Sequence, residues 1–481
     1  MSLRTLETTA LARLDEILAA PEGVRVGVLG LGVVGKAMTR HLLKRGAFVL
    51  GVDQHGGWKD DSFAKDLSDG GQLHLGPIGE GVFDDVELLV LSPGVDPRQP
   101  AVQAVWSAGK PVIGELELLG ELPARVVGIT GTNGKSTTTA LLGGIVASVV
   151  ENVFVGGNLG IPITTWISDA EETDVAVLEL SSYQLETAYR FSPEVAILLN
   201  ITPDHTERYD NHAEYAVAKR GLLENLSEDA VAILNYDDAL VRDMATHTRA
   251  RVVWFSLKDS LEGRDGVFVA GDSLVGSGCF ESHKPVALEH PRLFGWHNRQ
   301  NALAAFLAAD ALGLNEAQDW QQVREGYVAF TGLEHRLELV ANLNGVRFIN
   351  DSKATNDSAA AVAVRAIDRP VLLLAGGRGK GAGYGELLAA SINKVRHVVA
   401  FGEAGDEVAQ TFFNESEQVG AGVSRCTDLR EAFEEASFLA LPGDVVLLAP
   451  ACASFDEFSS YAARGRAFKK LVSELAAGGV C

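Results

Sequence analysis

Short apolar runs alternate with helix-like segments from about Arg25 onward. The runs RVGVLG, AFVLGVD and ELLVLSPG are rich in Val and Leu, and VVGKAMTRHLLKRG, between the first two, reads as a helix. Apolar runs of this length that alternate with helices are typical of βαβ units, in which parallel strands are buried between helices. The pattern predicts a parallel sheet near the N-terminus.

The same alternation starts twice more, after Leu122-Pro123 and after Thr331-Gly332. The second series contains RVVGITG, DVAVLELSS, VAILLNITPDH and AVAILN, and the third contains VRFINDS, RPVLLLAGG, HVVAFG and DVVLLAPA. A chain of 481 residues is too long for one core to grow comfortably. We therefore predict an α/β protein of three domains, at residues 1–122, 123–333 and 334–481.

The composition, 47% hydrophobic and 22% charged, is that of a soluble globular protein. A formal net charge of −23 argues against nucleic-acid or membrane binding, because both need clustered Lys and Arg. The longest apolar stretch, Ala140 to Val150, is far shorter than the roughly 20 residues that span a bilayer. Scattered cysteines suit reduced thiols, and the N-terminus lacks a signal-peptide core. We expect a cytoplasmic monomer with no nucleic-acid or membrane partner.

Three glycines between the first strand and the first helix form a GxGxxG pattern, Gly30-Leu-Gly32-Val33-Val34-Gly35, and Asp53 ends the next strand. Glycines at this spacing let a phosphate approach the backbone, the helix N-terminus offers N–H donors, and the carboxylate could meet a ribose hydroxyl. The pattern indicates a phosphate-binding turn. It does not distinguish NAD from another diphosphate nucleotide, and a purely structural tight turn is the alternative.

The segment Gly128-Ile-Thr-Gly131-Thr-Asn-Gly134-Lys135-Ser136 also follows a strand and opens a helix. We expect its backbone N–H groups to cradle phosphates, with Lys135 on the β and γ oxygens and the Ser136 hydroxyl on Mg²⁺. Ile129 stands where the strict GxxxxGK[ST] pattern has its first glycine. The strand and helix around the segment still favour a phosphate loop over a chance match.

Polar residues at later strand ends are further candidates, because open α/β sheets bind ligands at the carboxyl ends of their strands. Glu179 and His205 end strands of the second series and could hold a second hard cation, although each alone is more often a satisfied polar residue. Lys219 lies in a helix-like segment and, judged by composition alone, is a solvated lysine.

The third series carries two polar clusters at strand ends, NDSKATN and GGRGK. Lys353, Thr355 and Lys380 within them could bind a carboxylate or a phosphate, and solvated loops are the alternative. Ser454 in the segment ACASFDEF could donate to the same ligand or simply cap a helix.

Taken in order, these segments resemble the Mur ligases of peptidoglycan synthesis over nearly the whole chain. The resemblance is carried by GITGTNGKSTTT, GGNLGIP, LELSSYQLE, NITPDH, YAVAKRG, GWHNRQNA, FTGLEHRLE, INDSKATN and APACASFDEF. It implies a Rossmann-like N-terminal domain for a UDP group, a central P-loop ATPase-type domain with a mostly parallel sheet, and a Rossmann-like C-terminal domain for the amino acid. Two phosphate turns in one chain would then hold a UDP diphosphate and ATP.

The resemblance further implies an ATP-dependent ligase that joins D-glutamate to UDP-N-acetylmuramoyl-L-alanine through an acyl phosphate. ACASFDEF favours D-glutamate, and the sequence lacks the DNPR motif of the diaminopimelate-adding and lysine-adding members. The alternatives are another Mur or folylpolyglutamate-synthase-like ligase with a different amino acid, an oxidoreductase that uses the first turn, and a non-catalytic nucleotide-binding protein.

Individual site residues follow from the resemblance, position by position. The residues expected to act in catalysis are Lys135, Glu179, His205 and Lys219, the last as a carbamylated lysine that, with Ser136, Glu179 and His205, supports two Mg²⁺ ions. Those expected to bind ATP are Gly131, Thr132, Asn133, Gly134, Lys135, Ser136, Thr137, Asn298, Asn301, Arg336 and Asp351. Those expected to bind the UDP-muramoyl substrate are Gly30, Gly32, Val33, Val34, Asp53, Ser92 and Asn158. Those expected to bind D-glutamate are His205, Lys353, Thr355, Lys380, Ser454 and Tyr461.

Overall fold

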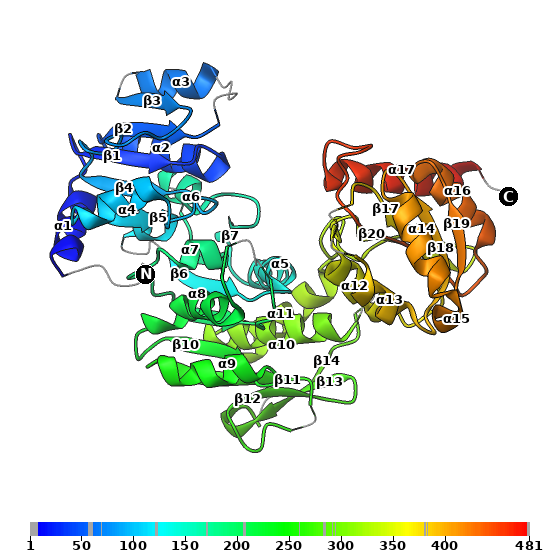
Figure 1. Cartoon of the computed structure of the whole chain (residues 1–481). Coiled ribbons are helices and arrows are strands. Elements are labelled where there is room, and N and C mark those ends of the chain that lie inside the picture. The colour runs from blue at the N-terminus through cyan, green and yellow to red at the C-terminus, as the bar shows by residue number, and fades with distance from the viewer. Residues whose placement is uncertain are drawn as a thin grey trace. The chain divides into compact units, whose positions relative to one another are not determined.

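The computed structural model describes residues 8–478 except 56–60, 69, 121–123, 170–171, 205–207, 259, 282–284, 291, 294, 380 and 382. The described residues form three sheets with helices packed on them (Figure 1). The first two sheets belong to one compact unit, Met1–Leu288 with Gln300–Tyr327. The third sheet belongs to the other, Glu289–Arg299 with Val328–Cys481.

The first sheet is parallel throughout, with strand order β3-β2-β1-β4-β5. Its elements are α1 (Thr8–Ala19), β1 (Arg25–Leu29), α2 (Val33–Lys44), β2 (Phe48–Asp53), α3 (Asp61–Ser68), β3 (Gly71–Leu75), β4 (Leu88–Leu91), α4 (Pro100–Ser107) and β5 (Val112–Gly114). Strand order reverses between β1 and β4, and the crevice at such a point is where open α/β sheets bind ligands.

The second sheet has nine strands in the order β14-β13-β12-β11-β10-β9-β6-β8-β7. Its strands are β6 (Arg125–Thr130), β7 (Val153–Gly157), β8 (Val175–Glu179), β9 (Val195–Leu198), β10 (Val231–Asn235), β11 (Arg251–Ser256), β12 (Gly266–Ala270), β13 (Ser273–Ser277) and β14 (Val286–Ala287). Its helices are α5 (Lys135–Val146), α6 (Ile163–Asp169), α7 (Ser182–Leu185), α8 (His212–Glu224), α9 (Ala239–Met244), η2 (Ala245–His247), η3 (Gly278–Phe280), α10 (Trp296–Ala311) and α11 (Ala317–Ala329). Strands β6 to β12 pair in parallel with one another, whereas β13 and β14 form an antiparallel edge.

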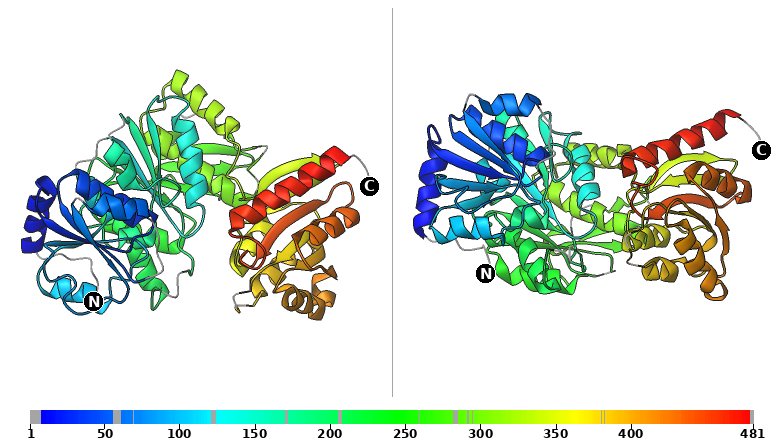
Figure 2. Two further views of the ribbon diagram at one scale, coloured as in Figure 1. Left: turned by 90° about the horizontal axis from the view of Figure 1, so that it is seen from above. Right: turned by 45° about the horizontal axis from the view of Figure 1, so that its top comes forward.

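The third sheet has the order β15-β16-β20-β17-β18-β19, parallel except for the edge strand β15. Its strands are β15 (Glu338–Leu343), β16 (Val346–Asn350), β17 (Val371–Gly376), β18 (Val395–Phe401), β19 (Gly422–Arg425) and β20 (Val445–Ala451). Its helices are α12 (Asp357–Ala366), α13 (Gly385–Ser391), α14 (Gly405–Asn414), α15 (Ser416–Val419), α16 (Leu429–Leu439) and α17 (Tyr461–Gly478). Helices lie on the faces of the sheets (Figure 2).

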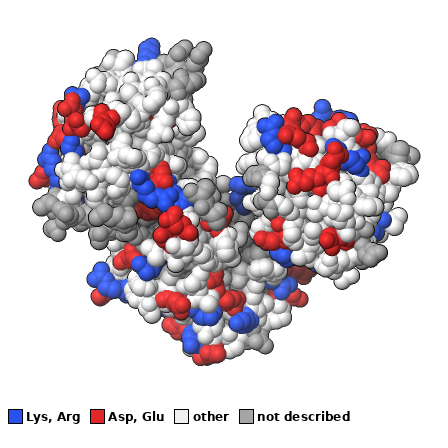
Figure 3. All heavy atoms as spheres, in the orientation of Figure 1, with Lys and Arg blue, Asp and Glu red and all other residues white. Residues whose placement is uncertain are grey.

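The predicted fold class, α/β with three domains, is confirmed, and each apolar run identified in the sequence forms a parallel strand. The parallel strands β3, β5, β7, β11, β12 and β19 were not identified. The domain boundaries stay predictions. Over the face shown in Figure 3, basic side chains are interspersed with acidic ones. None of the helices in the described ranges combines the length and the apolar character that crossing a membrane requires.

A short helix, η1 (Glu115–Leu119), joins the first sheet to the second through two buried carboxylates. Glu115 accepts hydrogen bonds from the N–H and the hydroxyl of Thr164, both at 3.0 Å, and from the Gln184 amide at 3.2 Å. Burial raises the pKa of Glu115, and these hydrogen bonds oppose that rise. Glu117, two residues further along η1, is likewise bound by groups of the second domain.

Replacement of Glu117 by alanine should destabilise this unit. The carboxylate accepts hydrogen bonds from the N–H groups of Tyr189 and Arg190 at 2.7 and 2.9 Å and from Nε of Arg190 at 2.9 Å. Loss of three bonds to one buried anion should lower the free energy of unfolding by about 2–4 kcal/mol. Urea unfolding followed by tryptophan fluorescence measures the change.

The control is Glu16→Ala, which removes an exposed partner of Arg13. Its effect should stay within about 0.5 kcal/mol. Equal unfolding midpoints for the Glu117 and Glu16 variants would contradict the role assigned to Glu117.

Candidate active site

The GxGxxG segment forms a tight turn between β1 and α2. Gly30 has a φ of 88°, which favours glycine, and a Cβ on Gly35 would lie 1.8 Å from the Gly30 carbonyl oxygen. Helix α2 begins at Val33, and no side chain caps its first N–H groups. These N–H groups are therefore disposed to bind an anion.

Two predicted substrate residues border this turn. Ser92 directly follows β4, and a Cβ on Gly30 would lie 2.9 Å from the Ser92 Cβ. Asp53 ends β2 and accepts hydrogen bonds from the N–H groups of Leu31 at 2.7 Å and His55 at 2.9 Å. Burial by itself raises the pKa of Asp53, but the hydrogen bonds outweigh burial and lower the pKa below its ordinary value. The ionised carboxylate thus braces the turn.

The second glycine-rich segment forms the loop between β6 and α5. Gly131 and Gly134 have φ values of 153° and 88°, and a Cβ on Gly134 would lie 2.4 Å from Oδ1 of Asn301. Helix α5 begins at Lys135 without a side-chain cap. The Lys135 ammonium donates to the carbonyls of Gly131 at 2.9 Å and Thr132 at 2.8 Å. The loop is a cradle of backbone N–H groups beside a lysine, as phosphate binding requires.

Asn200 holds this loop from the end of the neighbouring strand β9. Its side chain accepts from the Asn133 N–H at 2.8 Å and donates to the Asn133 carbonyl at 3.0 Å. Its own carbonyl accepts from the Thr132 N–H at 2.9 Å. Asn200 was not among the predicted site residues, although it opens the NITPDH segment and so stood at a predicted strand end.

Glu179 ends β8, the strand next to β6, and its carboxylate is buried. Oε1 accepts a hydrogen bond from the Asn158 amide at 2.7 Å, whereas Oε2 has no hydrogen-bond partner among the described residues. A buried anionic oxygen without a donor is costly unless a cation lies against it. The Glu179 carboxylate and the buried hydroxyl of Ser136 are hard oxygen ligands, so the residues present fit Mg²⁺.

Lys219 of α8 is only 1% exposed, so the interpretation of it as a solvated lysine is wrong. Its ammonium donates to the Gly131 carbonyl at 2.7 Å and lies 4.6 Å from the ring centroid of Tyr215. Burial, and after it the charge of Lys135, lower the pKa of Lys219 well below its ordinary value. The lowered pKa increases the fraction of neutral, nucleophilic amine.

In the other compact unit, one buried arginine ties three strand ends together. Arg464 of α17 donates to the hydroxyl and the carbonyl of Ser352, both at 3.0 Å, and to the carbonyls of Cys452 and Ala453 at 3.1 and 3.3 Å. It also donates to the Gly376 carbonyl at 3.5 Å. Burial lowers the pKa of Arg464 to about 10. Sequence reasoning missed this residue.

Of the residues predicted to bind D-glutamate, Lys353, Thr355 and Ser454 lie on the loops that Arg464 ties, and Tyr461 begins α17. The Lys353 ammonium lies 5.5 Å from the ring centroid of Tyr461, and the Ser352 hydroxyl donates to the Tyr461 carbonyl at 2.8 Å. Ser454 is buried on the loop after β20. The structure therefore gathers these residues at one end of the third sheet, together with the half-buried Thr355. His205 and Lys380, which were also predicted, lie outside the described residues.

Among the predicted nucleotide contacts, Asn298 and Asn301 are both buried on α10. Their spacing of three residues places them on one face of the helix. Asp351, directly after β16, is buried and accepts a hydrogen bond from the Leu337 N–H at 3.3 Å. Burial raises the pKa of Asp351 to about 7, and the nearby Arg336 opposes that rise.

Three family models match the chain. They are "Mur ligase MurD-like, N-terminal domain" over residues 24–114, "Mur ligase middle domain" over 129–309 and "Mur ligase, glutamate ligase domain" over 335–452. The UDP-N-acetylmuramoylalanine–D-glutamate ligase of Myxococcus xanthus is 40% identical, with 95% of this chain and 99% of the relative covered. That of Alkaliphilus metalliredigens is 38% identical, with 94% and 98% covered.

Among solved structures, MurF from Acinetobacter baumannii has a TM-score of 0.58 at 18% identity, with 98% of this chain and 99% of that chain covered. At that identity the similarity shows the fold alone. The family models and the two relatives carry the stronger conclusion, since they cover all three sheets: the chain belongs to the Mur ligase family.

Proposed function

We propose that this chain joins D-glutamate to UDP-N-acetylmuramoyl-L-alanine, with cleavage of ATP to ADP and phosphate, as a cytoplasmic monomer in peptidoglycan precursor synthesis. The observation that carries the proposal is the pair of glycine-rich turns, Gly30–Gly35 and Gly131–Ser136, at strand ends of two sheets in one compact unit. One turn suits a UDP diphosphate and the other suits ATP. Relatives that carry the name of this activity align along nearly the whole chain.

On the ATP side, Lys135 would neutralise the β and γ oxygens while α5 supplies N–H donors. Ser136, Glu179, His205 and Lys219 would hold two Mg²⁺ ions, Lys219 as a carbamate. Bound Mg²⁺ would offset the repulsion between the substrate carboxylate and the γ-phosphate. The unpaired Oε2 of Glu179 supports this assignment.

On the substrate side, the Gly30–Gly35 turn, Ser92 and Asn158 would hold the UDP-muramoyl group. The alanine carboxylate attacks the γ-phosphate to give an acyl phosphate and ADP, and the amine of D-glutamate then attacks the acyl carbon as phosphate leaves. Asn158 donates to Glu179, so the residue proposed for the substrate and the residue proposed for the metal are neighbours. The side chains that would bind D-glutamate are Lys353, Thr355, Lys380, Ser454 and Tyr461.

Phosphate release tests the proposed reaction. With ATP, Mg²⁺ and UDP-N-acetylmuramoyl-L-alanine present, D-glutamate should support release, whereas L-glutamate, lysine and diaminopimelate should not. Equal rates with all four amino acids would refute the proposed specificity. Release that does not require the UDP substrate would refute the reaction itself.

The Lys135→Ala variant should lose about 10²–10³-fold in kcat, because one preorganised positive group no longer faces the transferred phosphoryl group. The same phosphate-release assay measures the loss. Lys470 of α17 is a matched control, since its side chain is 75% exposed and Lys470→Ala removes the same charge from the chain. Equal activity of the two variants would exclude a role for Lys135 in phosphoryl transfer.

Carbamylation of Lys219 should be visible by ¹³C NMR. In ¹³C-bicarbonate the wild type should show one carbamate signal that Lys219→Arg lacks, because burial and Lys135 keep a neutral amine available. Removal of dissolved carbon dioxide should lower activity, and added bicarbonate should restore it. A spectrum identical for the two proteins, with activity indifferent to carbon dioxide, would rule the modification out.

A further inference from the structure

The first turn lies against the segment that follows β4. A Cβ on Gly30 would lie 2.8 Å from Cγ2 of Val95 and 2.9 Å from the Cβ of Ser92. The Val95 N–H donates to the Ser92 carbonyl at 2.9 Å. A displacement of Val95 therefore changes the wall of the turn in which a diphosphate would bind.

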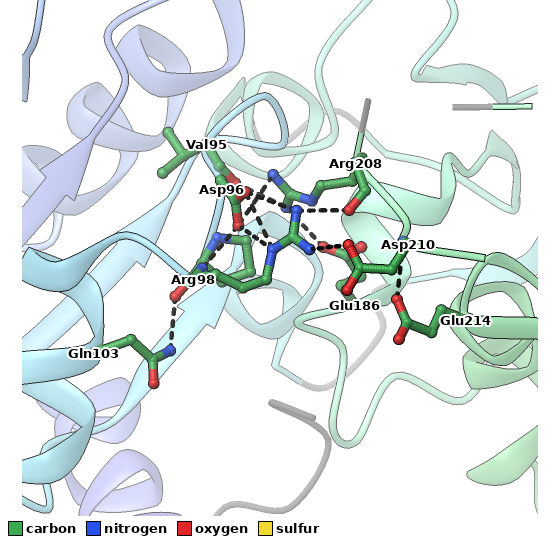
Figure 4. Close-up of polar contacts among 9 residues, drawn as sticks. Val95, Asp96, Arg98, Gln103, Glu186, Arg208, Asp210 and Glu214 are labelled. Carbon is green, nitrogen blue, oxygen red and sulfur yellow. Dashed lines mark hydrogen bonds and ion pairs between the residues drawn. The ribbon is translucent and has the colours of Figure 1, made fainter. Parts of the chain in front are cut away.

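Arg208, which precedes α8 in the second domain, reaches this segment (Figure 4). Its side chain is 9% exposed, and Nη2 donates to the Val95 carbonyl at 2.9 Å and to the Glu186 carboxylate at 2.7 Å. Asp96 lies 3.8 Å from Nη1. One buried guanidinium thus binds a carbonyl of the first domain and a carboxylate of the second, and its planar fork fixes both directions.

From Arg208 a series of aromatic contacts leads to the phosphate loop. The guanidinium lies 5.0 Å from the ring centroid of Tyr183, which stacks on Tyr209 at 6.2 Å. Tyr209 in turn meets Tyr215 at 5.3 Å, and the Tyr215 hydroxyl donates to Oγ1 of Thr132 at 3.2 Å. The contacts are continuous from the first domain to the ATP loop.

We propose that Arg208 is a positioning residue that couples the two turns, so that nucleotide in the phosphate loop strengthens binding of the UDP substrate at the first turn. The inference rests on the proposed function. Closely packed aromatic and ion-paired groups have few alternative arrangements, so a shift at Val95 is passed on to Thr132 instead of being absorbed. Tyr215 also covers Lys219, so the same contacts reach the buried amine.

Arg98, in the same cluster, is a matched control. It donates to the Arg208 carbonyl at 2.6 Å and to Asp96 at 3.0 Å, and it lies 3.5 Å from Asp210. Its side chain is 45% exposed, so solvent and salt screen its ion pairs. The loss of Arg98 should therefore leave the coupling between the two turns in place.

Isothermal titration measures the coupling. UDP-N-acetylmuramoyl-L-alanine is titrated into the full chain with and without a saturating non-hydrolysable ATP analogue and Mg²⁺. The analogue should tighten UDP-substrate binding at least about fivefold in the wild type and in Arg98→Gln, but less than about twofold in Arg208→Gln. In Arg208→Gln, the affinity for each ligand alone should change much less than the coupling does. A merely structural role of Arg208 would not produce that difference.

Wild-type coupling in Arg208→Gln would overturn the inference, as would a wild type that binds both ligands without coupling. If Arg208→Gln does not fold, Arg208→Lys replaces it, because lysine keeps the charge but lacks the planar guanidinium that fixes the directions of the two Nη2 hydrogen bonds, to Val95 and to Glu186. Full coupling in Arg208→Lys would then overturn the inference. A wild type that fails to bind the UDP substrate would instead contradict the proposed function, so the two failures are distinguishable.

Discussion

The rest of the structure depends on the backbone N–H groups at the starts of α2 and α5. A chain with a net charge of −23 does not attract polyphosphates through its surface as a whole, so we expect the positive ends of helices to bind them locally. Both helices follow glycine-rich turns and lack side-chain caps. The apolar strands β1 and β6 fix where these turns lie, so core packing and ligand chemistry meet at the same strand ends.

Buried charges recur at the domain junction and at the strand ends, and groups from separate elements stabilise each of them. Glu117 is bound by backbone and guanidinium N–H groups, and Arg464 by carbonyls that follow three strands. Removal of one partner of a buried charge costs on the order of 3–5 kcal/mol, so such residues hold loops in one arrangement. Oε2 of Glu179 is an exception among the described residues, and it lies where a cation is expected.

Most of the fold could be predicted from the sequence, because parallel strands buried on both faces leave continuous apolar runs. The parallel strands β3, β5, β7, β11, β12 and β19 and the antiparallel strands β13, β14 and β15 were not predicted, since each is short, only partly buried or at a sheet edge. Glu179 was found because it stands at a strand end. Arg208 and Arg464 were missed because their roles depend on burial by partners 113 and 112 residues away, which no local pattern reveals.

The Gly131 carbonyl brings two lysines together, Lys135 of the glycine-rich loop and Lys219 of α8. Lys135 and Lys219 donate to this one oxygen at 2.9 and 2.7 Å, so two ammonium groups there repel each other. Burial penalises the charged form of Lys219 more, because Lys135 is only half-buried. Burial, and after it the charge of Lys135, therefore lower the pKa of Lys219. One carbonyl oxygen thus holds a half-buried lysine of the glycine-rich loop and a buried lysine whose lowered pKa favours the neutral amine.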